Sequence, residues 1–298
     1  MNQKKYTMFM RMHPLVNFMY FLVMMLFVMF YVHPVLLGIA GIVCFAYLCY
    51  LGGNKQFRTM LTLIPFIMLL SLINPLFNRN GDTVLCYVFH RPITLEASLY
   101  GLVAALMIYD MILLFRVFHI IMSSDKIICL FSKMLPIGTL LFTMTLRFVP
   151  MYKAQLAKMR LAQKGIQHDV TQGTRIQKIR NGVELISGLI TWALENGLES
   201  ADSMKGRGYG LSGRTSYANM KFTKLDWNVF ALEVVLALGL LYGSFHHVFQ
   251  ISYYPVLTWR RGGMLEIVCY SLYGLFALIP LIIDYKEEMT WHFLRQKI

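Results

Sequence analysis

The stretch Leu198-Glu-Ser-Ala-Asp-Ser-Met-Lys-Gly-Arg-Gly-Tyr-Gly210 closes a polar, basic region that is about 75 residues long. Apolar segments long enough to cross a membrane lie on both sides of this region. From position 150 to position 225 the region has twelve Lys and Arg against five Asp and Glu, a net charge of +7. A basic insert between membrane spans that ends in Gly-Arg-Gly indicates a surface for a cytoplasmic partner.

The composition is that of a membrane protein. Of 298 residues, 57% are hydrophobic and 14% are charged, with a mean hydropathy of +0.55, whereas soluble domains have about 25% charged residues. The formal net charge of +13 falls mainly between the apolar runs, so we expect no nucleic-acid partner. Five cysteines form no CxxC pair and are predicted to be packing residues rather than disulfides or metal ligands. They are Cys44, Cys49, Cys86, Cys129 and Cys269.

Six apolar segments are long enough to be transmembrane helices, since a span needs about 20 residues. In the fifth, Gly239 and Gly243 form a GxxxG motif, which predicts close packing against another helix. A shorter apolar segment at 137–149, bracketed by Pro136 and Pro150, is predicted to lie at the membrane interface or under the bundle. The six spans are 15–32, 34–51, 59–77, 95–118, 227–249 and 264–283.

The positions of Lys and Arg predict that both termini of this multi-pass protein lie in the cytoplasm, because cytoplasmic loops are enriched in these residues. With that orientation most basic residues fall on the cytoplasmic side, which then includes the whole 150–225 region. The cytoplasmic set outside that region is Lys4, Lys5, Arg11, Lys55, Arg58, Lys126, Lys133, Lys286, Arg295 and Lys297. The exceptions, in loops predicted to be outside, are Arg79, Arg91, Arg260 and Arg261.

The basic region contains two predicted helices. The first covers 151–164 and stops near Gly165; the second runs from the N-cap Thr174 to about Met204. Apolar residues of the second helix recur every three or four positions, so they form one stripe that must lie on a membrane surface, the first helix or another protein. The stripe is Ile176, Ile179, Val183, Ile186, Ile190, Ala193, Gly197, Ala201 and Met204. A solvated helical hairpin with ordinary caps is the alternative interpretation.

Each of these helices ends in a cation beside glycine, namely Lys164-Gly165 and Gly206-Arg207-Gly208. Glycine removes bulk around the cation, so that the side chain can enter a groove. A guanidinium can then pair with a carboxylate through two hydrogen bonds. The alternative is a cation that is favourably placed at a helix C-terminus and has no partner.

Asp110 is an acidic residue well inside the fourth span. Intramembrane carboxyl groups are expensive and are often functional. Asp110 could serve an ion path or pair with Arg116 or Arg147 between helices, and the lack of a polar ladder beside it favours the pairing. A self-contained secondary transporter or channel that uses Asp110 is the alternative function. An intramembrane enzyme is disfavoured, because no cluster of acids, histidines or a nucleophile appears.

Three motifs in this order resemble the T component of energy-coupling-factor (ECF) importers of prokaryotes: Arg147-Phe-Val-Pro150, Arg160-Leu-Ala-Gln163 and Ala201-Asp-Ser-Met-Lys-Gly-Arg-Gly-Tyr209. The resemblance covers most of the chain in layout and about 70 residues in detail. It implies an all-α integral membrane protein of the plasma membrane, an L-shaped scaffold with about six transmembrane helices and a cytoplasmic insert of amphipathic coupling helices. The implied domains are 1–122 (spans one to four), 123–226 (interfacial helix and coupling helices) and 227–298 (spans five and six).

The resemblance also implies partners. They are two cytoplasmic ATP-binding-cassette ATPase subunits, which hold ATP and Mg, and a membrane substrate-binding (S) component that captures a vitamin or trace nutrient. This chain would bind no cofactor and would not be an enzyme, and it has no Walker A sequence. The first tip has lysine where the family has arginine, so we predict unequal binding at the two tips. The implied ATPase-docking residues are Gln163, Lys164, Gly165, Gly206, Arg207 and Gly208.

Overall fold

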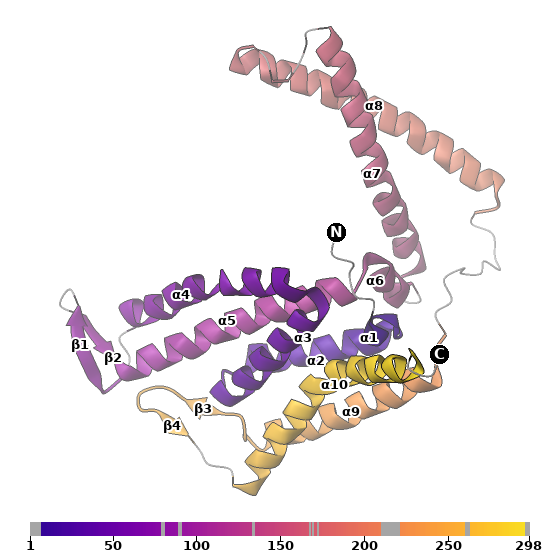
Figure 1. Cartoon of the computed structure of the whole chain (residues 1–298). Helices are drawn as coiled ribbons and strands as arrows, with labels where there is room; N and C mark the ends of the chain where they lie inside the picture. Colours follow the sequence, from indigo (N-terminus) through magenta and orange to yellow (C-terminus); the bar gives the residue numbers. More distant parts are fainter. Residues whose placement is uncertain are drawn as a thin grey trace. The chain divides into compact units, whose positions relative to one another are not determined.

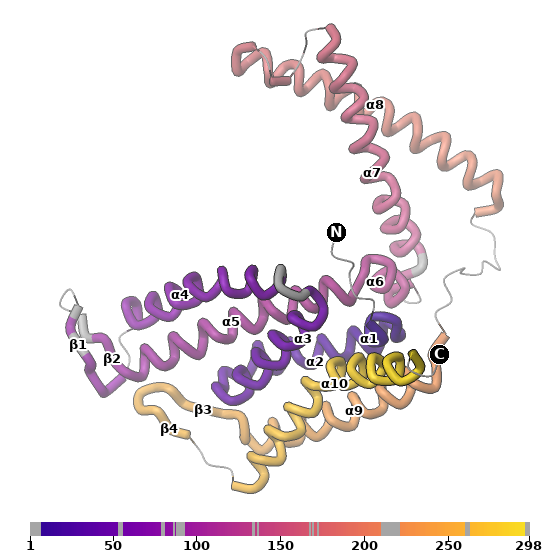
Figure 2. Tube along the Cα trace, in the orientation of Figure 1, coloured from indigo at the N-terminus to yellow at the C-terminus, as the bar shows by residue number. Residues whose placement is uncertain are grey.

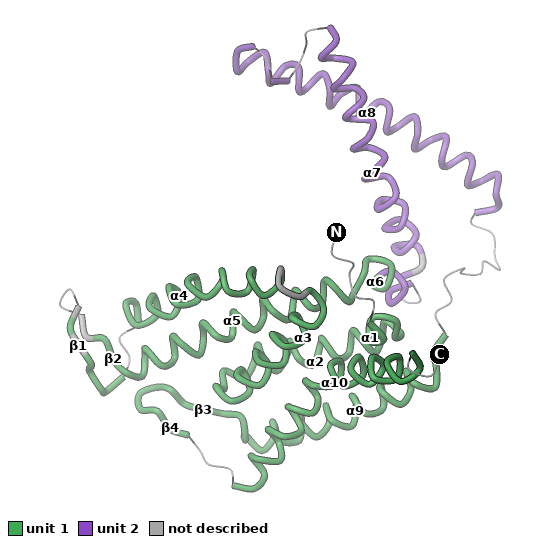
Figure 3. The backbone as a smooth tube through the Cα atoms, in the orientation of Figure 1, with its two compact units in different colours: residues 1–127, 220–298 green, residues 128–219 purple. Residues whose placement is uncertain are grey.

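The computed structural model is mostly helical and forms two compact units (Figure 3). Unit 1 is residues 1–127 together with 220–298, and unit 2 is residues 128–219. The helix α6 (Ser124–Phe131) crosses the boundary between them. The structure describes residues 7–78, 81–88, 91–132, 135–166, 168, 170–171, 173–209, 221–259 and 263–295.

Unit 1 is a bundle in which segments far apart in the sequence lie side by side (Figures 1 and 2). In the bundle α5 packs on α2, α3 and α4, and α10 packs on α3 and α9. The polar insert therefore interrupts a bundle whose last two helices return to the first ones. Its helices are α1 (Met8–Arg11), α2 (Pro14–Phe30), α3 (Pro34–Leu61), α4 (Ile64–Phe77), α5 (Leu95–Ile121), α9 (Lys224–Phe245) and α10 (Met264–Arg295).

The core of unit 1 is rich in aromatic rings from α1, α2, α5 and α10. Tyr20 stacks on Phe276 with ring centroids 5.4 Å apart, and it meets Phe9 edge-on at 5.6 Å. The Tyr20 hydroxyl donates a hydrogen bond of 2.8 Å to the carbonyl oxygen of Ala277. The contacts of Tyr20 with Phe276 and Ala277 join residues more than 250 positions apart, so they fix how α10 meets α2.

Five helical segments are long and apolar enough to cross a membrane: Pro34–Gly52, Gln56–Phe77, Leu95–Ile121, Lys224–Phe245 and Met264–Arg295. The segment Gln56–Phe77 combines the end of α3 with α4. The remaining predicted span corresponds to α2, an apolar helix of 17 residues. The prediction of an all-α membrane protein is confirmed, with one of the six apolar helices shorter than expected.

Glycines set the closest helix contacts in unit 1. A Cβ at Gly243 would lie 2.5 Å from the Cys269 sulfur, and one at Gly239 would lie 3.3 Å from Leu272 Cδ1. The predicted close packing through the GxxxG motif is therefore confirmed, with α10 as the neighbour of α9. A Cβ at Gly101 on α5 would lie 2.7 Å from the backbone oxygen of Ser71, which cannot rotate away.

Two antiparallel hairpins, which the sequence did not predict, lie at one end of unit 1 (Figure 1). β1 (Val84–Val88) pairs with β2 (Arg91–Thr94), and β3 (Ile251–Ser252) pairs with β4 (Thr258–Trp259). The segment before β1 and the loop between β3 and β4 are joined by the Asn78 amide, which donates a hydrogen bond of 2.9 Å to the Tyr254 hydroxyl. The two hairpin regions are thus tied together.

Unit 2 consists mainly of two long helices, α7 (Pro136–Gly165) and α8 (Arg175–Gly206). The expected separation of a 137–149 helix from a 151–164 helix is wrong, because α7 continues through Pro150. Proline removes one backbone hydrogen bond of a helix. Here the residues on both sides of Pro150 remain helical, so α7 is continuous.

The predicted ends of these helices are confirmed. α7 stops at Gly165, and α8 begins after Thr174, whose N–H donates a hydrogen bond of 3.0 Å to Gln177 Oε1. After the end of α8, Gly208 has a φ of +76°, a left-handed conformation that favours glycine.

Some sequence predictions fall on residues outside the described set. Of the five cysteines, the four whose side chains the structure describes are free, as expected: Cys44, Cys49, Cys129 and Cys269. The orientation charges outside the described residues are Lys4, Lys5, Arg79, Lys133, Arg260, Arg261 and Lys297.

Candidate functional site

Arg207 lies at the exposed end of α8. It is the C-cap residue of that helix, and its N–H donates to the carbonyl oxygens of Ser203 at 3.2 Å and Met204 at 3.1 Å. The backbone of the tip is therefore hydrogen-bonded while the side chain is exposed. A Cβ at the preceding Gly206 would meet nothing within 4 Å. No described residue of this chain lies close enough to require glycine at this position.

Lys164 occupies the corresponding position at the end of α7. The lysine and the following Gly165 are exposed, and a Cβ at Gly165 would again meet nothing within 4 Å. The carbonyl oxygen of Gln163 accepts hydrogen bonds from Ile166 N at 3.2 Å and His168 N at 3.0 Å. The two glycine-flanked cations thus have the same local design, a closed helix end with an exposed basic side chain.

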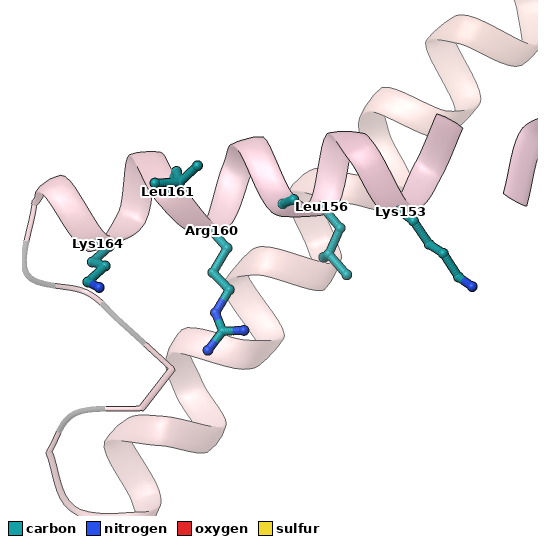
Figure 4. Close-up of a pocket in the computed structure, with 6 residues that line it drawn as sticks. Lys153, Leu156, Arg160, Leu161 and Lys164 are labelled. Carbon is teal, nitrogen blue, oxygen red and sulfur yellow. The ribbon is translucent and has the colours of Figure 1, made fainter. Parts of the chain in front are cut away.

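Lys164 also belongs to a basic row along α7. Lys153, Arg160 and Lys164 are seven and four residues apart, which places them on one helix face. Figure 4 shows their side chains projecting from the same side of the helix. With Leu156, Ala157 and Leu161 they line a groove of about 440 Å³. The sequence analysis missed Lys153 in this row, although the seven-residue spacing within one helix could have shown it.

The two tips lie far apart along unit 2. Lys164 is near the turn that leads into α8, and Arg207 is at the opposite end of that helix. α8 has 32 residues, so at 1.5 Å per residue its ends are about 48 Å apart. One small ligand therefore cannot contact both tips.

The apolar stripe of α8 is exposed for most of its length. Ile176 is 80% exposed, Ile179 68% and Ile190 55%. A different face of α8 packs on α7, where Trp192 meets the Tyr152 ring edge-on at 5.7 Å. Of the three alternatives for the stripe, packing on the first helix is therefore wrong, and a membrane surface or another protein remains.

Asp110 lies in the core of unit 1, 1% exposed, on α5. Its Oδ2 has no hydrogen-bond partner, and its Oδ1 lies 2.6 Å from the place where a Cβ on Gly41 would be. The favoured pairing with Arg116 is wrong within the described residues, and Arg147 belongs to unit 2. Instead, Asp110 packs against the bare backbone of α3.

The described residues contain no group of three or more His, Cys, Asp or Glu side chains that could hold a metal ion. The candidate site presents exposed cations and an exposed apolar surface. Such groups can bind carboxylates and apolar faces.

Comparison with known proteins gives the family. Residues 7–217 match the model of the CbiQ family, which is described as "Cobalt transport protein". The chain belongs to the CbiQ family. It is a multi-pass membrane component of a transport system and not an enzyme. The metal in the family description is not assigned to this chain.

Three curated relatives are named "Energy-coupling factor transporter transmembrane protein EcfT". The one from Staphylococcus aureus (strain 04-02981) is 26% identical over 61% of this chain and 71% of its own length. The one from Streptococcus thermophilus (strain ATCC BAA-250 / LMG 18311) is 32% identical over 34% of this chain and 38% of its own. The one from Bacillus subtilis (strain 168) is 32% identical over 33% and 37%. This member of the CbiQ family is thus a distant homologue of EcfT components.

Proposed function

We propose that this chain is the coupling subunit of an ECF-type ATP-driven importer. In this role it joins two cytoplasmic ATPase subunits to a separate membrane S component that captures a vitamin or trace nutrient. The observation that carries the proposal is the pair of exposed cations beside glycine, Lys164 at the C-terminal end of α7 and Arg207 at the C-terminal end of α8. Each of them presents a positive charge that a carboxylate-lined groove can accept.

In the proposed mechanism each tip docks on one ATPase. Arg207 docks with its neighbours Gly206 and Gly208, and Lys164 docks with Gln163 and Gly165. When ATP binding and hydrolysis move the ATPases, a long continuous helix transmits the movement without bending. α8 and α7 then carry it to the exposed apolar stripe, which grips the S component. ATP and Mg stay on the partner subunits.

The proposed orientation puts both termini and unit 2 in the cytoplasm of a prokaryotic cell. The positive-inside rule supports this orientation, because it puts the basic region on the same side of the membrane as Arg11, Arg58 and Arg295. The two hairpins, at the end of unit 1 opposite to α1, then face outward. The domain division that follows has spans in 1–122 and 227–298 and the coupling helices in 123–226.

The test is recovery of the complex. The chain is co-expressed with the ATPase and S subunits of the same organism, and the complex is quantified in detergent. Arg207→Glu should remove the ATPases, because it reverses the charge at the tip. Arg175→Glu is the matched control, since it makes the same change at the other end of α8, where an acidic residue suits the helix dipole.

If the complex is recovered equally well with the Arg207→Glu variant, docking at that tip is contradicted. A wild-type chain that binds no ATPase would contradict the proposal itself. The alternative is then a self-contained transporter that uses Asp110, which is favoured by its buried carboxyl oxygen without a partner. In that case Asp110→Asn should abolish transport, whereas it should leave ATPase recovery unchanged in the coupling subunit.

A further inference from the structure

His33 lies where three segments of unit 1 meet, at the end that carries the hairpins. It precedes α3 and lies beside β4 and the first turns of α10. The neighbouring loop is also tied down, because the Tyr253 hydroxyl donates a hydrogen bond of 2.8 Å to the carbonyl oxygen of Val32. A change at His33 would therefore reach all three segments.

The imidazole of His33 is the N-cap of α3. Its Nδ1 accepts a hydrogen bond of 3.3 Å from the N–H of Val35, the first N–H of the helix, because Pro34 has none. His13 caps α2 in the same way, with Pro14 next in the chain and Leu15 N as donor at 3.2 Å. An imidazolium has no acceptor nitrogen, so only neutral histidine can form this cap.

The cap fixes the direction of a chain of hydrogen bonds. Since Nδ1 accepts, the ring proton is on Nε2, which donates to the Tyr270 hydroxyl at 2.8 Å. That hydroxyl donates to Glu266 Oε1 at 2.6 Å, and the Trp259 indole N–H donates to the same oxygen at 3.0 Å. Every bond in this relay is consistent with a neutral imidazole and a carboxylate.

The surroundings of His33 keep it neutral. The side chain is 0% exposed, and it packs against the rings of Trp259 at 5.4 Å and Tyr270 at 5.2 Å. Burial lowers the pKa of His33, and the charge of Glu266 opposes that shift. Among the described residues, the titratable groups that face the imidazole are Glu266 and Tyr270 from α10. Tyr253 bonds to Val32, the residue before His33, and β4 contributes the uncharged Trp259.

We propose that His33 is a proton-sensitive clasp. While neutral, it holds the start of α3, β4 and the start of α10 together; when protonated at Nδ1, it releases the α3 cap and loosens the β3–β4 hairpin. The clasp is a property of unit 1 and does not depend on the coupling function. In the orientation proposed above, it would sense the pH outside the cell.

The sign of the effect follows from linkage. In the unfolded chain the imidazole has its ordinary pKa of 6.5, and in the folded state the pKa is lower. The stability that neutral His33 contributes is therefore fully present well above pH 6.5 and is lost as the pH falls through the folded-state pKa. Acidification should open this end of the bundle, whereas alkaline pH should leave it closed.

Hydrogen exchange of the full-length chain in lipid nanodiscs tests the clasp. Peptides that cover 33–40 and 256–270 are followed between pH 5 and 8, with labelling times scaled to the intrinsic rate at each pH. Loss of one N-cap corresponds to an exchange rate about fivefold higher. We expect that increase at low pH in both peptides of the wild type.

Three variants separate the clasp from general loosening. His33→Asn keeps a good N-cap that does not titrate, so the pH response should vanish in both peptides. Tyr270→Phe breaks the relay, so 33–40 should keep its response while 256–270 loses it. His13→Asn, the matched change at the cap of α2, should leave both responses as in the wild type.

A wild-type pH response that persists in His33→Asn would overturn the proposal, as would a wild type without any response. If His33→Asn does not fold, the fluorescence of Trp259 is titrated in a chain in which Trp192, Trp227 and Trp291 are replaced by Phe. A transition below pH 6.5 is expected, and a flat emission would then overturn the clasp. These readouts need no ATPase, so failure here is distinct from failure of the coupling function.

Discussion

The two units differ in whether they form a buried apolar core. Unit 1 has such a core, which joins α2, α3, α5, α9 and α10, although its long helices also expose many large apolar residues. Among the described residues of unit 2, Leu185 is the one buried hydrophobic residue, at 9% exposure, whereas most of the stripe on α8 is exposed. Unit 1 thus has a packed interior of its own, whereas the described part of unit 2 has almost none and exposes the apolar stripe of α8. The difference teaches that an amphipathic pattern alone does not show whether a helix packs within its own chain.

The strongest way to test this contrast is to add bulk in each unit. Gly101→Leu places atoms against the backbone of Ser71 and should lower the free energy of unfolding by about 3 kcal/mol or more. A Cβ at Gly188 in α8 would meet nothing within 4 Å, so Gly188→Leu should be neutral or stabilise the helix by up to about 0.8 kcal/mol. Thermal unfolding in detergent measures both, and equal losses would contradict the contrast.

A buried cation in unit 1 should behave unlike the exposed cations of unit 2. Lys126 is 8% exposed, its Nζ has no hydrogen-bond partner, and burial lowers its pKa to about 8, partly opposed by Asp226. The unfolded chain has the ordinary pKa of 10.5, so the charged amine costs stability at pH 7. Lys126→Met should therefore raise the free energy of unfolding by about 3 kcal/mol at pH 7.

The gain from Lys126→Met should be largest below pH 8 and should disappear as the pH approaches 10.5, because the amine is then neutral in both states. Lys158→Met, at an exposed position on α7, is the control and should show no such pH dependence. Unfolding midpoints measured across this pH range check the prediction. A gain that does not change with pH would mean that improved packing and not the charge is responsible.

The exposed stripe should matter for assembly and not for folding. Ile186→Glu should leave the unfolding midpoint of the isolated chain within a few tenths of a kcal/mol of wild type. It should lower recovery of the S component at least tenfold, since it puts a charge into an apolar contact. Ser187→Glu, the next residue on an exposed face, is the control. Loss of folding in Ile186→Glu would place the stripe in the chain's own core.

The smallest expected effect concerns the two tips. Arg207→Ala should weaken ATPase binding more than Lys164→Ala, because guanidinium pairs with carboxylates through two hydrogen bonds and ammonium does not. Lys164→Arg should in turn strengthen binding several-fold. Titration of the purified chain with each ATPase measures these differences. Equal losses at the two tips would contradict unequal docking.

Local patterns predicted much of the candidate site. The N-cap Thr174 and the glycines after Lys164 and Lys205 mark helix ends by short-range backbone chemistry, and the structure ends α7 and α8 there. The basic row on α7 was predicted only in part. Its members all lie within the predicted 151–164 helix, so the seven-residue spacing from Lys153 to Arg160 was already visible, but Lys153 was not grouped with the tip residue Lys164.

The sequence by itself determined the membrane class, the apolar helices, the helix ends and the GxxxG contact, because each depends on periodicity or composition within one segment. Only the tertiary structure decided that Asp110 packs against Gly41, that the stripe of α8 is exposed and that His33 meets Tyr270. His33 and Tyr270 are 237 positions apart. Such partners are selected by the packing of whole helices, which no local pattern encodes.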